Sequence, residues 1–159
     1  MEIIFNEQEL AEIEKIQAKY PVKESSIMPI LWMAQKKFGW ISNEVVSYIA
    51  KLLDISPSKI EGIATFYTMF FKKPMGKHHL QVCTNVSCML RGGVKIYKHL
   101  SDKLKISNME TTEDGVFSLE ECECMGACGG APMVAINEDY YENISIEKLE
   151  EILTKLKDQ

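Results

Sequence analysis

Four cysteines stand in two close pairs that could bind a metal. Four residues separate Cys83 from Cys88, three separate Cys124 from Cys128, and 35 residues lie between the pairs. The thiolate form of cysteine is a strong metal ligand. The chain has five cysteines, an odd number that disulfides cannot fully consume. Metal ligation therefore explains the two pairs better than a disulfide framework does.

The spacing leaves two kinds of metal centre open. A cluster of two irons and two sulfides is usually held by four convergent thiolates, and the two pairs supply that number. Structural zinc also uses paired cysteines, typically with about two to four residues between them. The spacing favours iron and sulfur over zinc, and disulfides least. A dithiol enzyme of the thioredoxin type is disfavoured because the sequence contains no Cys-x-x-Cys.

Cys122 is the one cysteine outside the two pairs, and one residue separates it from Cys124. In a strand, both side chains would point to the same side, so Cys122 could lie near the metal. One intervening residue is tight for two ligands of one small cluster. We therefore predict that Cys122 is a buried free thiol and leave it out of the ligand set.

Glycines flank both cysteine pairs. Gly126, Gly129 and Gly130 can adopt positive φ and bring backbone N–H groups close to the sulfurs. Gly92 and Gly93 fall inside a helical pattern, where each costs about 1 kcal/mol relative to alanine. This cost predicts that another part of the chain packs closely against them.

The residues before the first cysteine predict a helical domain. Apolar residues recur at steps of three and four along 6–20, 24–38, 42–53 and 56–64. Pro21 and Gly39 would end the first two helices. Either Ser42 or Asn43 could cap the third helix, and Ser56 could cap the fourth. An aromatic run at 65–71 is expected to join the core or to contact another subunit, and residues 72–76 predict a domain boundary.

The pattern changes after this boundary. Alternating or apolar segments predict strands at 79–84, 115–118 and 132–136, and helical spacing predicts helices at 89–104 and 144–157. Strands that alternate with helices indicate a small α/β layer structure. The predicted fold class is thus a helical N-terminal domain, 1–75, followed by an α/β domain, 76–159.

Charge and motif content exclude several functions. The net charge is −5 with no basic cluster, so neither nucleic acid nor an anionic membrane surface is an expected partner. No apolar run reaches the roughly 18 residues of a membrane span, and no signal pattern opens the chain, which favours a cytoplasmic protein. Neither of the common glycine-rich phosphate loops occurs. His78, His79 and His99 show no nucleophile or carboxylate partner at a telling spacing, and we expect surface or internally satisfied histidines.

Longer motifs around the cysteines resemble a known family. The residues are Cys-Thr-Asn-Val-Ser-Cys-Met-Leu-Arg-Gly-Gly at 83–93 and Glu-Cys-Met-Gly-Ala-Cys-Gly-Gly-Ala-Pro-Met-Val at 123–134. Segments 38–41, 60–67 and 139–141 extend the likeness over nearly the whole chain. Together they resemble the 24 kDa subunit family of NADH:quinone oxidoreductase, a thioredoxin-like [2Fe-2S] ferredoxin.

The resemblance implies a helical N-terminal domain followed by a thioredoxin-like fold. It implies one [2Fe-2S] cluster held by Cys83, Cys88, Cys124 and Cys128, with Cys122 outside the ligand set. FMN and NAD(H) would lie on a larger flavoprotein partner, not on this chain. The chain would then transfer single electrons as part of an NADH dehydrogenase complex, without being an enzyme by itself.

Three alternatives remain open from the sequence. The same subunit type occurs in soluble NAD-linked hydrogenases and formate dehydrogenases, including bifurcating assemblies. A module with a structural zinc site could act as an adaptor whose helical half recruits a partner. A redox sensor could use Cys122, provided that this thiol is exposed and has a low pKa. For the electron carrier, we expect Phe66, Tyr67, Phe70 and the helical domain to dock the partner.

Overall fold

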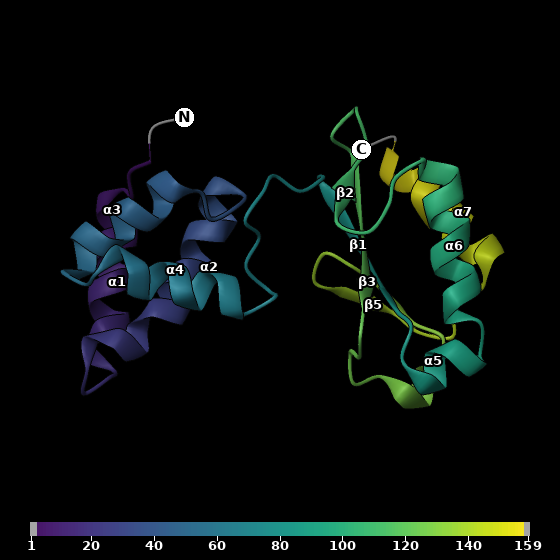
Figure 1. The fold of residues 1–159 in the computed structure, drawn as a ribbon, viewed down its shortest axis with the longest axis horizontal. Coiled ribbons are helices and arrows are strands. Elements are labelled where there is room, and N and C mark those ends of the chain that lie inside the picture. The colour runs from purple at the N-terminus through teal and green to yellow at the C-terminus, as the bar shows by residue number, and fades with distance from the viewer. Residues whose placement is uncertain (1–2, 158–159) are drawn as a thin grey trace. The chain divides into compact units, whose positions relative to one another are not determined.

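The structure is a computed structural model that describes residues 3–157. The chain divides into two compact units between Pro74 and Met75. The first unit is entirely helical, and the second is a sheet with helices (Figure 1). Over the described residues, no helix is both long enough and apolar enough to cross a membrane. The predicted fold class, with helices at the N-terminus and α/β layers after them, is confirmed.

The first unit contains the four predicted helices. They are α1 (Glu7–Ala18), α2 (Ile27–Phe38), α3 (Asn43–Leu53) and α4 (Pro57–Phe66). A short 3-10 helix, η1 (Lys23–Ser26), precedes α2, so the second helix begins later than the apolar pattern suggests. Aliphatic side chains from every helix are fully buried in one core, among them Ile13, Ile30, Leu31, Ile49, Leu53 and Ile60.

Local side-chain chemistry explains where these helices begin and end. The Asn6 side chain accepts a hydrogen bond from the Glu9 N–H at 2.9 Å, and the Glu9 carboxylate accepts one from the Asn6 N–H at 2.7 Å. This reciprocal capping box satisfies two free backbone donors. The Ser42 hydroxyl likewise caps α3. The prediction that the Ser56 side chain caps α4 is wrong, because its hydroxyl is paired with the Ser58 hydroxyl at 2.8 Å.

The aromatic run at 65–71, which begins at the end of α4, is partly core and partly surface. The buried Gln35 side chain in α2 donates to the Met69 carbonyl at 2.8 Å and accepts from the Phe71 N–H at 2.6 Å. This clamp places Phe70 in the core, with 5% of its surface exposed. Phe66 is 77% exposed. The expectation that Phe70 docks a partner is therefore wrong, because that ring is already covered by its own unit.

The second unit is a five-stranded sheet in the order β2-β3-β1-β4-β5. The strands are β1 (His78–Cys83), β2 (Glu110–Thr111), β3 (Phe117–Cys122), β4 (Val134–Ile136) and β5 (Asp139–Tyr141). β1 and β3 are parallel, and the other neighbouring pairs are antiparallel. The sequence did not predict β2 or β5, which have only two and three residues.

Helices cover one face of this sheet. α5 (Val86–Leu90) and α6 (Gly93–Leu104) follow β1, and α7 (Ile146–Lys157) ends the described chain. α6 and α7 run beside the sheet on the same side in Figure 1. Alternate strand residues and the apolar stripes of both helices form the core, which includes Leu80, Val82, Ile96, Leu100, Leu119, Val134, Leu149 and Leu153. The single helix predicted at 89–104 is wrong, because Gly92 has φ 102° and separates α5 from α6.

Candidate metal centre

The parallel pairing of β1 and β3 brings the two cysteine segments to the same end of the sheet. Cys83 is the last residue of β1, and Cys122, the last residue of β3, lies directly opposite it. Cys88 follows on α5, and Cys124 lies two residues beyond β3. The carboxyl ends of parallel strands are a common location for ligand sites in α/β proteins.

Cys83 and Cys88 belong to a small, buried apolar cluster. Both thiols are buried together with Ala131 and Met133, and Met125 and Ala127 pack against this group. The Cys83 N–H donates to the Met133 carbonyl at 3.3 Å, which links β1 to the segment before β4. This cluster thus joins the first cysteine pair to residues on both sides of Cys128.

Gly93 lets the backbones of the first pair approach α6. A Cβ added at Gly93 would lie 2.5 Å from the Cys83 carbonyl oxygen and 3.0 Å from the Cys88 carbonyl oxygen. Real side chains do not tolerate such distances, so only glycine fits here. The predicted close packing at the glycine pair is confirmed for Gly93. Gly92 has open space around it and is needed for its positive φ instead.

The second pair lies on an exposed loop that the β4–β5 hairpin contacts. Cys124 and Cys128 are both exposed, and a 3-10 helix, η2 (Cys128–Gly130), begins at the second thiol. The Asn143 N–H donates to the Gly130 carbonyl at 2.6 Å, and the Tyr140 hydroxyl donates to the Met125 carbonyl at 3.3 Å. These two bonds attach the loop to the hairpin on either side of Cys128.

The glycines of this loop differ from the prediction. Gly126 has φ 75°, as expected, but Gly129 and Gly130 do not have positive φ. Gly130 is required for space, because an added Cβ would collide with the Glu142 side chain. Backbone freedom therefore explains one of these three glycines, and close packing explains another.

Three of the four predicted ligands interact electrostatically. Burial raises the pKa of the Cys88 thiol, the Cys83 side chain raises it further, and Cys128 adds a smaller effect in the same direction. Within residues 3–157, however, no three Cys, His, Asp or Glu side chains are arranged closely enough to hold a metal ion. The structure therefore brings the segments of the two pairs together, but it does not place four thiols in ligating geometry.

The donor set still fits an iron–sulfur cluster. All five cysteines are free thiols, so none of the four predicted ligands is consumed by a disulfide. Two of the four thiols are buried among apolar side chains, which limits solvent access to a centre bound there. Thiolates in two pairs are the ligands that such clusters use.

Cys122 has a different environment from the other four cysteines. Its burial, and then the charge of Glu120, raise the pKa of the Cys122 thiol to about 12. A half-buried thiol with a raised pKa lacks the reactive thiolate that a redox sensor needs. The local environment thus disfavours the sensor hypothesis.

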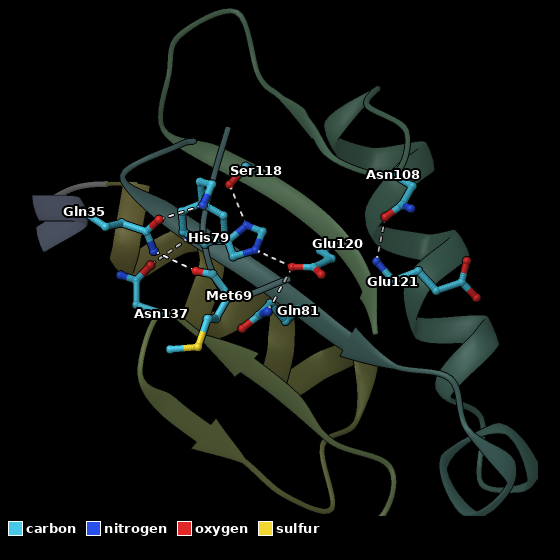
Figure 2. A network of polar contacts seen from close by, with 10 residues as sticks. Gln35, Met69, His79, Gln81, Asn108, Ser118, Glu120, Glu121 and Asn137 are labelled. Atoms are coloured by element: carbon cyan, nitrogen blue, oxygen red, sulfur yellow. Dashed lines mark hydrogen bonds and ion pairs between the residues drawn. The ribbon is translucent and has the colours of Figure 1, made fainter. Parts of the chain in front are cut away.

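A buried polar network links the neighbouring strands β1 and β3. His79 Nδ1 is 2.8 Å from the Ser118 hydroxyl, and His79 Nε2 is 2.8 Å from the Glu120 carboxylate. Gln81 also donates to Glu120, at 2.9 Å (Figure 2). Burial raises the pKa of the Glu120 carboxyl, but the hydrogen bonds from His79 and Gln81 outweigh this effect and lower it overall.

Sequence reasoning missed this network. It assigned no carboxylate partner to the histidines, yet His79 contacts Glu120 and His99 contacts Glu150 at 2.6 Å. The expectation that the histidines are internally satisfied is confirmed for His79 and His99. His78 differs, because its Nε2 atom is buried without a hydrogen-bond partner in the described structure. The contact between His79 and Ser118 follows from the strand register of β1 and β3, because the two residues lie opposite each other in the parallel pair.

Comparisons with known proteins agree with the cysteine pattern. A subunit of the NADH-quinone oxidoreductase of Rickettsia bellii is 46% identical over 156 residues, which cover 96% of this chain and 93% of that protein. A subunit of the NADH-quinone oxidoreductase of Rhizobium meliloti is 42% identical over 142 residues, which cover 89% of this chain and 84% of that protein. The likeness therefore extends over nearly the full length of both proteins.

A solved structure has the same fold. The crystal structure of an NAD+-reducing [NiFe]-hydrogenase in the H2-reduced state matches 84% of this chain with a TM-score of 0.74 and 19% identity. This chain spans only 22% of the matched hydrogenase chain. At this identity, the match shows the fold alone.

A family model described as thioredoxin-like [2Fe-2S] ferredoxin matches residues 13–157. The matched region includes both cysteine pairs, all strands of the sheet and most of the helical unit. The relatives, the fold and the paired thiols at the ends of β1 and β3 lead to one assignment: the chain belongs to the thioredoxin-like [2Fe-2S] ferredoxin family.

Proposed function

We propose that this chain is the [2Fe-2S] electron-transfer subunit of an NADH-oxidising flavoprotein module. The observation that carries the proposal is the match of nearly the whole chain to relatives named as one type of NADH-quinone oxidoreductase subunit. The two cysteine pairs at one end of a thioredoxin-like sheet support it, because they offer four thiols from two converging segments.

The proposed ligands are Cys83, Cys88, Cys124 and Cys128. When bound, the cluster would supply a one-electron redox centre. The apolar side chains packed around Cys83 and Cys88 would keep water from one side of that centre, and Gly93 would hold the two ligand backbones against α6. Backbone N–H groups of the loop around Gly126 would be available as hydrogen-bond donors to sulfur, which is one way to tune the reduction potential.

The relatives are named as subunits, so this chain is proposed to act within a complex. Its partner would be a larger flavoprotein that carries FMN and the NADH site. The resemblance of the cysteine motifs to the 24 kDa subunit type supports this choice of partner. A cytoplasmic location and two separate domains, one helical and one α/β, complete the proposal.

The hydrogenase and formate dehydrogenase alternatives keep the same chemistry with a different parent complex. The structural likeness to a hydrogenase chain is at 19% identity and does not discriminate between the parent complexes. The names of the relatives at 42% and 46% identity favour the NADH-quinone oxidoreductase.

Spectroscopy and metal analysis of the anaerobically purified chain test the proposal. We expect a red-brown protein with about two irons and two sulfides, and an S = 1/2 EPR signal after reduction with dithionite. Stoichiometric zinc in a colourless protein without such a signal would contradict the proposed electron-transfer function and would support the adaptor with structural zinc.

A further inference from the structure

An exposed apolar face covers α5 and the beginning of α6. Val86, Met89 and Leu90 are 61%, 48% and 77% exposed, and Val94 is 45% exposed. Val86, Met89 and Leu90 are spaced by three and four residues, so they share one side of α5. We call these four residues the α5 face. Large apolar side chains gathered in this way on a soluble protein are typical of an interaction site.

The α5 face lies directly over a proposed ligand. Cys88 belongs to the same five-residue helix but is buried on the side of Ala131 and Met133. α5 lies at the end of the sheet where β1 ends (Figure 1). A helix is about 10 Å across with its side chains, so a group seated on the α5 face lies within about that distance of the thiol. Electron tunnelling slows steeply with distance, which makes this face suitable for a redox partner.

The charged residues on the segment that carries the α5 face all have the same sign. Arg91, Lys95 and Lys98 are exposed, and the sequence contains no Asp or Glu from 84 to 101. This basic segment stands out in a chain with 23 acidic and 18 basic residues. Lys95 and Lys98 are three residues apart on α6 and so share one side of that helix, and Arg91 directly follows α5. The complementary surface is apolar at its centre and bears carboxylates at its rim.

We propose that the α5 face is the docking surface for the flavoprotein subunit. The inference rests on the proposed function and extends it, because it assigns the contact to one surface of this chain. The partner presents an apolar patch bordered by carboxylates. Apolar contacts at Val86 and Leu90 supply most of the affinity, and Arg91 and Lys95 supply orientation and a fast association rate.

Binding of the full-length chain to the purified flavoprotein subunit tests this proposal. The double variants Val86→Ser/Leu90→Ser and Arg91→Glu/Lys95→Glu change only exposed side chains, so the fold should be kept. Two control variants alter exposed residues elsewhere, Val22→Ser on the first unit and Lys155→Glu on α7. Iron content and the EPR spectrum of every variant report whether the redox centre is intact.

We expect the apolar double variant to weaken binding at least tenfold with unchanged iron content. The charge-reversal variant should slow association strongly at low salt and much less at high salt, because exposed charges are screened. Both controls should bind like the wild type. Iron-loaded double variants that bind as tightly as the wild type would overturn the proposal.

Two further outcomes separate this proposal from the function on which it rests. A wild-type chain that dimerises alone, and becomes monomeric in the Val86→Ser/Leu90→Ser variant, would overturn the proposal by showing a contact between copies. A chain without iron that still binds the flavoprotein through this face would contradict the electron carrier but support the docking surface.

Discussion

Gly93→Ala is the substitution for which the structure predicts the clearest penalty. The new Cβ would lie 2.5 Å from the Cys83 carbonyl oxygen and 3.0 Å from the Cys88 carbonyl oxygen. Both neighbours are backbone atoms, which cannot move aside as a flexible side chain could. Relieving the collision must shift α6 away from β1 or move one of the two ligand backbones.

The expected magnitude follows from two opposing effects. Overpacking of this kind costs about 1–3 kcal/mol. Alanine at a helical position recovers at most about 1 kcal/mol of helix propensity relative to glycine, and less at the first residue of α6. We expect the second unit to lose about 1–2 kcal/mol of unfolding free energy. For a domain of this size, each kcal/mol lowers the Tm by about 4–8 °C.

Urea denaturation followed by circular dichroism measures this loss, and iron analysis after reconstitution measures the effect on the site. Gly62→Ala is the matched control, because Gly62 lies within α4 and has no atom within 4 Å of an added Cβ. That control should stabilise the protein by up to about 1 kcal/mol. Equal stability of Gly93→Ala and the wild type, with full iron content, would refute the packing argument.

Three further predictions concern other parts of the chain. Glu120 has a lowered pKa, so its contribution to stability is present above the ordinary carboxyl pKa of 4.5 and is lost as the pH falls through the folded value. Urea denaturation from pH 7 to pH 3 should show that Glu120→Gln loses less unfolding free energy on acidification than the wild type does. Parallel plots of unfolding free energy against pH would exclude this role of the His79 contact. Cys122→Ala should keep the iron and the EPR signal while Cys88→Ala loses both, and equal iron loss in the two variants would show that the proposed ligand set is wrong. Asn6→Ala removes the capping box and should cost about 0.5–2 kcal/mol in thermal or urea denaturation, whereas an unchanged midpoint would mean that α1 does not need its cap.

Local chemistry made the helical half predictable. Capping side chains, proline and apolar residues at helical spacing act within a few positions of one another, so the local sequence indicates approximately where each helix lies. Asn6, Ser42 and Gly39 stand close to the ends that the structure shows. The same holds for the candidate ligands, because two close cysteine pairs can be recognised without a fold.

By itself, the sequence determined the helices of the first unit, the change to α/β layers after residue 76 and the four thiols that could bind a cluster. Tertiary structure decided which distant residues meet. The parallel register of β1 and β3 places Ser118 and Glu120 against His79, although about forty residues separate them along the chain. The close approach of Gly93 to the Cys83 backbone holds α6 beside the end of β1, and the Gln35 clamp buries Phe70. Such outcomes depend on contacts between remote segments, which no local pattern of residues can specify.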